Sequence, residues 1–157
     1  MLAGEQDTVC LAQRLAAAVM RLRPDAPLLI YLEGELGAGK TTLCRALLEA
    51  LGWEGPVPSP TYSLFEPYET GLPALPLVLH LDLYRLADPA ELEFLGLRDY
   101  LGSPSLWLVE WPQHGRGFLP APDLVLTLKH GGGDARCLRL TACSARGQRL
   151  QADANVS

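Results

Sequence analysis

Residues 34–41, GELGAGKT, fit the pattern G-x-x-x-x-G-K-[ST], which in proteins surrounds a phosphate group. A loop that turns several backbone N–H groups toward one anion needs positions without a β-carbon, and the glycines of this stretch provide them. The pattern predicts that Lys40 bridges the β- and γ-phosphates of a nucleoside triphosphate. It also predicts that the Thr41 hydroxyl binds Mg²⁺.

The elements that must position this loop are visible on both sides of it. Residues 27–32, PLLIYL, have the length and composition of a buried parallel strand. Residues 42–51 place leucine and alanine on one helical face, and Gly52 supplies a stop. The loop therefore lies between a strand and a helix, whose N-terminus would direct its free N–H groups at the same anion.

Two carboxylates end apolar strands elsewhere in the chain. Asp82 closes the stretch 77–82 and Glu110 closes the stretch 105–110. Because ligands of open α/β sheets bind beyond the carboxyl ends of the strands, both acids are expected beside the loop. Phosphoryl transfer needs one carboxylate for the metal and a polar group that orients the nucleophile, and the sequence leaves open which acid has which role.

Several cationic side chains are candidates for the same site. Arg85, Arg98 and Arg116 each offer positive charge for a transition state, although surface ion pairing is the commoner fate of a single arginine. His80 lies two positions before Asp82, on the same strand face, where a structural hydrogen bond and a role in proton transfer are equally compatible with the pattern.

The remaining pattern predicts an α/β fold, a single-domain P-loop NTPase-like three-layer sandwich with a mixed central sheet. Residues 4–23 have the spacing of an amphipathic helix. Residues 61–68 and 76–82 favour an antiparallel strand pair across a short turn. Asp88 begins a capped helix with proline at its first position. Residues 123–128 and 136–141 flank a glycine turn typical of a hairpin.

Length and composition limit the organisation of the chain. The 157 residues suit one domain, predicted for residues 1–143, with a flexible tail over residues 144–157. The net charge of −5 argues against a broad nucleic-acid surface. The four cysteines form no C-x-x-C pair, which favours reduced thiols. The sequence has no long apolar stretch or secretion signal, so we expect a cytoplasmic protein without a membrane partner.

The nucleotide base can be predicted from what the sequence contains. Guanine-specific P-loop proteins use an Asn-Lys-x-Asp sequence, and Asn155 is the only asparagine of this chain. ATP is therefore the expected nucleotide, with Mg²⁺ as its metal.

Four sequence blocks together resemble one protein family, the bacterial TsaE (YjeE) ATPases of tRNA threonylcarbamoyladenosine synthesis. The blocks are GELGAGKTT at residues 34–42, SPTY at 59–62, HLDLYRL at 80–86 and VEWP at 109–112. The phosphate loop alone is unspecific, but the four blocks in this order are specific, and the resemblance extends from about residue 5 to about residue 140.

The resemblance implies a small P-loop protein that binds ATP and Mg²⁺ and hydrolyses ATP slowly when alone. It also implies work with the TsaD and TsaB subunits in the modification of adenosine 37 of tRNA, with tRNA reached through the complex. By this resemblance Thr41 and Glu110 hold the metal, Asp82 assists hydrolysis and Thr61 belongs to a nucleotide-sensing switch.

The same resemblance places Thr8 near the adenine. The expected catalytic residues are Lys40, Asp82 and Glu110. The expected nucleotide-binding residues are Thr8, Glu35, Leu36, Gly37, Ala38, Gly39, Lys40, Thr41 and Thr42.

Two other functions fit the same loop. A small-molecule kinase would share it, but would also need an acceptor pocket and an arginine-bearing lid, and no arginine-rich insertion is evident. A nucleotide-gated binding module would use the nucleotide to change its affinity for a partner, with incidental hydrolysis.

Overall fold

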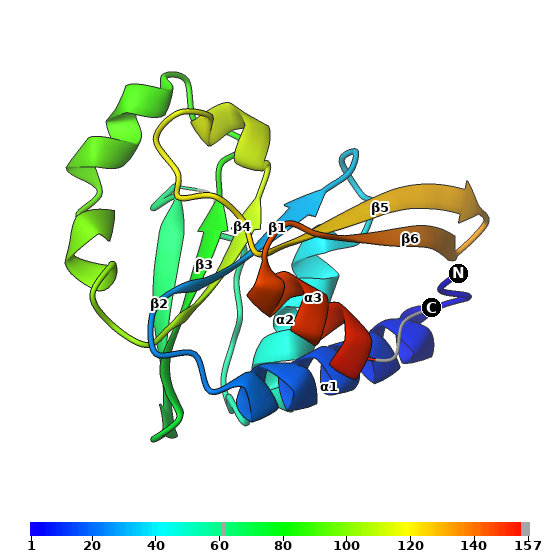
Figure 1. Ribbon diagram of the computed structural model, residues 1–157. Helices are drawn as coiled ribbons and strands as arrows, with labels where there is room; N and C mark the ends of the chain where they lie inside the picture. Colours follow the sequence, from blue (N-terminus) through cyan, green and yellow to red (C-terminus); the bar gives the residue numbers. More distant parts are fainter. Residues whose placement is uncertain (61, 155–157) are drawn as a thin grey trace.

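The computed structural model describes residues 1–60 and 62–154, and six of their strands form one mixed sheet (Figure 1). The strand order is β2-β3-β4-β1-β5-β6. The four central strands β3, β4, β1 and β5 are parallel, and the edge strands β2 and β6 are antiparallel to their neighbours. The strands are β1 Leu28–Glu33, β2 Phe65–Leu72, β3 Leu75–Asp82, β4 Leu106–Glu110, β5 Leu124–Gly132 and β6 Ala135–Ala142.

Helices cover one face of this sheet, and short 3-10 segments cover the other (Figure 1). The helices are α1 Glu5–Leu22, α2 Lys40–Ala50 and α3 Ala145–Asp153. The opposite face carries the 3-10 segments η1 Pro89–Phe94, η2 Leu97–Tyr100 and η3 Pro112–Gly115. The predicted α/β class, the three layers and the mixed sheet are therefore confirmed.

Alternation along the central strands explains the two layers of core. Leu28 and Ile30 pack with the helices, whereas Leu29, between them, packs in the cluster that contains Trp107. Side chains of a strand point alternately to its two faces, so a strand with apolar residues throughout can bury both. The unbroken apolar runs of the sequence reflect this burial.

The segment after Asp88 differs from the predicted helix. Asp88 forms the predicted capping box, because its side chain accepts from the Ala90 N–H while Glu91 accepts from the Asp88 N–H. The segment nevertheless forms the 3-10 helix η1 instead of an α-helix. Gly96, with a φ of 75°, separates it from the second 3-10 helix η2. The capping box therefore predicted the start of the element correctly, but the chain forms two short 3-10 helices rather than one α-helix.

Strand β2 begins later than the predicted 61–68 segment. Leu64 has a φ of 65°, and its carbonyl accepts from the Asp82 N–H just before the strand pairs with β3. The predicted antiparallel pairing of the two strands is confirmed. Thr61, the predicted switch residue, lies outside the described residues.

The predicted flexible tail is wrong for residues 145–153, which form α3. Ser144 caps this helix by accepting from the Gly147 N–H. The Arg146 guanidinium forms an ion pair at 2.9 Å with the carboxylate of Asp123, the residue before β5, and Leu150 is fully buried. A largely polar helix gains stability from such tertiary contacts, which its own sequence does not reveal.

No helix of the described chain combines the length and the apolar character needed to cross a membrane.

Candidate functional site

The glycine loop runs from the end of β1 at Glu33 to the start of α2 at Lys40. Gly34 has a φ of 145°, and a β-carbon at this position would collide with the backbone oxygen of Leu128 on β5. Gly39 has a φ of 100° and caps α2. Both positions therefore require glycine, the first because a neighbouring strand is close and the second because of its backbone conformation.

Lys40 folds back over this loop. Its Nζ donates to the carbonyl oxygens of Gly34 at 2.6 Å and Glu35 at 2.8 Å, and it lies 4.3 Å from the centre of the Trp111 ring. Burial lowers the pKa of Lys40, while the nearby carboxylates of Glu110 and Asp82 oppose this change. The ammonium group is thus held at the loop by oxygen atoms that phosphate oxygens could replace.

Glu110 is buried at the end of β4 and is held by side chains from two other elements. The Thr41 hydroxyl donates to both carboxylate oxygens at 2.9 Å. His80 Nε2 lies 2.8 Å from Oε1, and since a carboxylate only accepts hydrogen bonds, Nε2 is assigned the hydrogen. These contacts fix the carboxylate beside the first turn of α2.

The oxygen atoms of Thr41 and Glu110 suit Mg²⁺. Magnesium prefers oxygen ligands at about 2.0–2.1 Å in an octahedron, in which neighbouring ligand oxygens lie about 2.8–3.0 Å apart. The Thr41 hydroxyl and the Glu110 carboxylate have this separation. These two side chains therefore fit adjacent positions of a magnesium ion.

Strand register explains why the two predicted acids meet. Asp82 pairs with Glu110 between β3 and β4, and Glu110 pairs with Leu32 on β1. Paired residues of neighbouring strands point to the same face, which here is the face under α2. The two carboxylates and the glycine loop are therefore brought to one edge of the sheet.

Asp82 has a more open environment than Glu110. Its Oδ2 accepts from the Ser59 hydroxyl at 2.9 Å, and its Oδ1 accepts from the Tyr84 N–H at 3.1 Å. Asp82 is only half-buried, and both Ser59 and Tyr84 are exposed. This carboxylate is held by groups that solvent can reach.

These side chains surround a pocket of about 460 Å³, called the loop pocket below. Asp82, Glu110 and Lys40 all line it, so the three predicted catalytic residues lie together. Its lining consists of Leu36, Gly37, Gly39, Lys40, Thr41, Thr42, Ser59, Asp82, Tyr84, Arg85, Glu110 and Trp111.

Three of the predicted nucleotide-binding residues are described by the structure but do not line the loop pocket. Glu35 contributes its carbonyl oxygen to Lys40, and Ala38 is buried beneath the loop. Thr8 lies in α1, where its hydroxyl donates to the Gly4 carbonyl at 3.4 Å, and it is not among the described residues that line the loop pocket. Its proximity to an adenine stays a prediction.

The candidate arginines separate clearly. Arg85 lines the loop pocket, and its guanidinium lies 5.3 Å from the centre of the Tyr62 ring. Arg98 pairs with Glu93 at 3.3 Å on the surface, and Arg116 lines a different hollow beside η3. Of the three, only Arg85 is placed to meet a ligand of the loop pocket.

Sequence reasoning did not assign Ser59, Tyr84 and Trp111 to the site. Trp111 follows Glu110 with a φ of 57°, and its ring lies 4.9 Å from that of Tyr84. Ser59 and Tyr84 contact Asp82 directly. Their positions inside three of the recognised sequence blocks, one residue in each, were the available signal.

Comparison with known proteins identifies the family. The family described as "Threonylcarbamoyl adenosine biosynthesis protein TsaE" matches residues 2–138. A protein of Haemophilus influenzae named "tRNA threonylcarbamoyladenosine biosynthesis protein TsaE" is 42% identical over 138 residues, which are 88% of this chain and 85% of that protein. A Bacillus subtilis protein of the same name is 40% identical over 121 residues, covering 77% of this chain and 73% of the relative.

A solved structure agrees with the sequence relatives. The crystal structure of Bacillus subtilis YdiB superposes with a TM-score of 0.75 at 26% identity, covering 97% of this chain and 89% of YdiB. The sequence match covers most of the chain, including the glycine loop and both strand-end acids. The chain therefore belongs to the TsaE family of threonylcarbamoyladenosine biosynthesis proteins.

Proposed function

We propose that this protein is a Mg²⁺-dependent ATPase that supports threonylcarbamoyl modification of adenosine 37 in tRNA together with TsaB and TsaD. One observation carries the proposal: the Thr41 hydroxyl and the Glu110 carboxylate lie 2.9 Å apart in the pocket that Lys40 enters. A hydroxyl, a buried acid and a lysine on a glycine loop are the groups that bind a magnesium-bound triphosphate.

Binding follows from the loop and from Lys40. The backbone N–H groups at the start of α2 and in the glycine turn favour an anion there. When phosphate oxygens replace the carbonyls of Gly34 and Glu35, Lys40 keeps its hydrogen bonds and gains an opposite charge. Thr41 and Glu110 would hold Mg²⁺, which supplies positive charge against the charge of the leaving phosphate oxygens.

Asp82 is the acid available for the attacking water. It lines the loop pocket and is half-buried, and hydrogen bonds from Ser59 and the Tyr84 N–H orient it. A carboxylate so placed can accept a hydrogen bond from water and orient it for attack. Glu110 is less suited to this role because Thr41 and His80 occupy its oxygens.

The exposed side of the loop pocket suits a protein that is slow alone and accelerated by partners. Arg85 and Tyr62 lie there, and Tyr62 is 89% exposed. A partner surface that covers this side would exclude water and fix the arginine, both of which favour phosphoryl transfer. The named relatives are tRNA threonylcarbamoyladenosine biosynthesis proteins, which supports a role in this tRNA modification. TsaB and TsaD are the partners that we propose, and the cytoplasm is the proposed location.

The test compares ATP hydrolysis by the purified protein alone and with TsaB, TsaD and tRNA. We expect slow hydrolysis alone, stimulation in the mixture and loss of both in Lys40→Ala. The matched control is Lys129→Ala, which removes the other lysine of the chain from an exposed position. Normal hydrolysis by Lys40→Ala would overturn the proposal.

The same assay distinguishes the two alternative functions. Transfer of phosphate to an added metabolite rather than to water would identify a small-molecule kinase. Support of tRNA modification by an Asp82→Asn protein that binds ATP without turnover would identify a nucleotide-gated binding module.

A further inference from the structure

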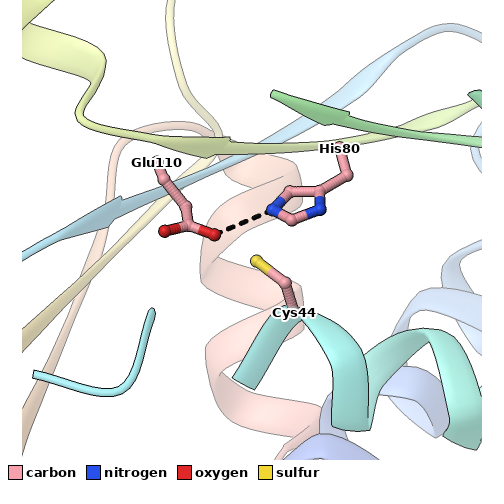
Figure 2. Close-up of side chains that lie close together, drawn as sticks. All are labelled: Cys44, His80 and Glu110. Carbon is pink, nitrogen blue, oxygen red and sulfur yellow. Dashed lines mark hydrogen bonds and ion pairs between the residues drawn. The ribbon is translucent and has the colours of Figure 1, made fainter. Parts of the chain in front are cut away.

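Three side chains with metal-binding chemistry meet beneath the loop pocket (Figure 2). Cys44 comes from α2, His80 from β3 and Glu110 from β4. All three are buried, with exposed fractions of 0%, 0% and 2%. Cys44 Sγ, a His80 ring nitrogen and a Glu110 carboxylate oxygen lie within 4.8 Å of one another. The sulfur points toward the gap between imidazole and carboxylate (Figure 2).

This donor set differs from the one that suits magnesium. Thiolate, imidazole and carboxylate together are typical of Zn²⁺, whereas Mg²⁺ prefers oxygen alone. Zinc distances of about 2.3 Å to sulfur and about 2.0–2.2 Å to nitrogen and oxygen require tetrahedral ligands roughly 3.3–3.6 Å apart. His80 Nε2 and Glu110 Oε1 are 2.8 Å apart in this structure and would separate slightly around zinc, while Cys44 Sγ would move closer to both of them.

We propose that Cys44, His80 and Glu110 form a zinc site, and that zinc and the magnesium nucleotide exclude one another because both require Glu110. On binding, the metal takes the sulfur lone pair, and the thiol proton passes to solvent. His80 Nε2 gives up its hydrogen for a metal bond, and the hydrogen is placed on Nδ1. The proposed zinc site depends only on the three side chains of the cluster, whereas the exclusion also rests on the proposed ATPase function.

The surroundings indicate an exchangeable site rather than a permanent structural one. It offers three protein ligands, which leaves a fourth position, and Glu110 lines the loop pocket through which a metal would enter. His80 Nδ1 is buried without a hydrogen-bond partner among the described residues. Zinc-binding histidines are usually supported through this second nitrogen, and lack of the support weakens affinity by about 10–100-fold.

Cobalt titration tests the site without nucleotide. The protein for this experiment carries Cys10→Ser, Cys137→Ser and Cys143→Ser, so that Cys44 is its only thiol. We expect Co²⁺ to give a near-ultraviolet sulfur-to-cobalt charge-transfer band that saturates at one equivalent and disappears when Zn²⁺ is added. Adding Cys44→Ala should abolish the band and weaken zinc binding by at least about tenfold.

Two results would overturn the zinc site: no band with the single-thiol protein, or a band that survives Cys44→Ala. Far-ultraviolet circular dichroism verifies that each variant is folded. Should Cys44→Ala not fold, His80→Gln in the same background makes the comparison, because loss of the imidazole should weaken zinc binding while the thiol remains.

A second measurement tests exclusion. Saturating Zn²⁺ should weaken binding of magnesium ATP by at least about fivefold, and magnesium ATP should weaken zinc binding by the same factor, since coupling between sites is reciprocal. A chelator should restore the original affinity. Zinc binding with unchanged nucleotide affinity would overturn the exclusion alone. Zinc binding by a protein without ATPase activity would overturn the proposed function and leave the zinc site intact.

Discussion

The two sides of the loop pocket are built in contrasting ways. The inner wall is formed by Thr41 and Glu110, with His80 and Cys44 packed behind the carboxylate, and this acid is 2% exposed. The outer wall is formed by Ser59, Asp82 and Arg85, and beside Arg85 lies the Tyr62 ring, whose residue is 89% exposed. Both walls contribute one carboxylate to the same pocket.

The contrast indicates a division of work. Buried and half-buried hydrogen bonds among side chains from α2, β3 and β4 keep Glu110 in place before any ligand arrives. Asp82 depends on Ser59, which belongs to the segment before β2. We therefore expect the inner wall to control metal and nucleotide affinity and the outer wall to control turnover.

The largest expected effect is that of Glu110→Gln on the inner wall. Loss of the carboxylate charge should remove the Mg²⁺ dependence of ATP binding and lower turnover by about 1,000-fold, as when a preorganised charged contact is lost. Calorimetry with and without Mg²⁺ measures the first effect. Glu33→Gln, at the end of the neighbouring strand β1, is the matched control. Unchanged Mg²⁺ dependence in Glu110→Gln would contradict the assignment of the metal to the inner wall.

Asp82→Asn should separate the two walls. Because an amide cannot accept a proton from water, turnover should fall by about 100-fold. Affinity for magnesium ATP should change by less than about threefold, since the inner wall is intact. Steady-state kinetics and calorimetry on the same preparation give both numbers. An equal loss of affinity and turnover would contradict the division of roles between the walls.

His80 should act on magnesium through Glu110. Removing the donor in His80→Ala should weaken Mg²⁺ binding by about 10–100-fold, the usual effect of losing a group that supports a metal ligand. His80→Gln keeps an N–H donor and should restore part of the affinity. A titration of ATPase activity with Mg²⁺ compares the three proteins. Equal Mg²⁺ affinity in all three would show that His80 serves packing alone.

Ser59→Ala should have a smaller effect on turnover. It removes one exposed hydrogen bond to Asp82, of the kind that contributes about 1 kcal/mol, so turnover should fall roughly fivefold. Ser63→Ala removes a comparable hydrogen bond to Glu66 in the same segment and provides the control. The comparison of the walls would weaken if the control lowered turnover equally.

Thiol labelling should leave the inner wall unmodified. Burial raises the pKa of Cys44 well above its usual value, and nearby Glu110 adds to the effect, so the reactive thiolate is suppressed at neutral pH. Iodoacetamide should label the exposed Cys137 and Cys143 first and Cys44 only after unfolding. Mass spectrometry locates the labels. Rapid labelling of Cys44 in the folded protein would indicate that the inner wall opens.

The sequence predicts the main elements of the site because short-range rules determine them. The glycine pattern fixes the turn between β1 and α2, and the apolar strands ending in Asp82 and Glu110 place both acids at one sheet edge. The difference between the two environments could not be predicted, because it depends on contacts from distant segments, Thr41 and His80 at Glu110 and Ser59 at Asp82.

Long-range contacts are the part that the sequence does not reveal. His80 and Glu110 are 30 positions apart, and only the β3–β4 register brings them within 2.8 Å. In the same way, the sequence of α3 alone has the composition of a polar tail, and the ion pair between Arg146 and Asp123 appears only in the folded structure. Gly147 is needed because a β-carbon there would collide with the backbone oxygen of Asp123. Each contact joins segments whose local patterns are unremarkable.

The position of Trp111 has a practical consequence. Its indole lies under the ammonium group of Lys40 at 4.3 Å, whereas Trp53 packs against Tyr68 and Trp107 is fully buried in the sheet. We expect the phosphate oxygens of the proposed nucleotide to draw Lys40 away, which would change the electric field at this indole and with it the fluorescence. Trp111 would then report nucleotide binding without an added dye, and a Trp111→Phe variant would show which part of the signal comes from the other two tryptophans.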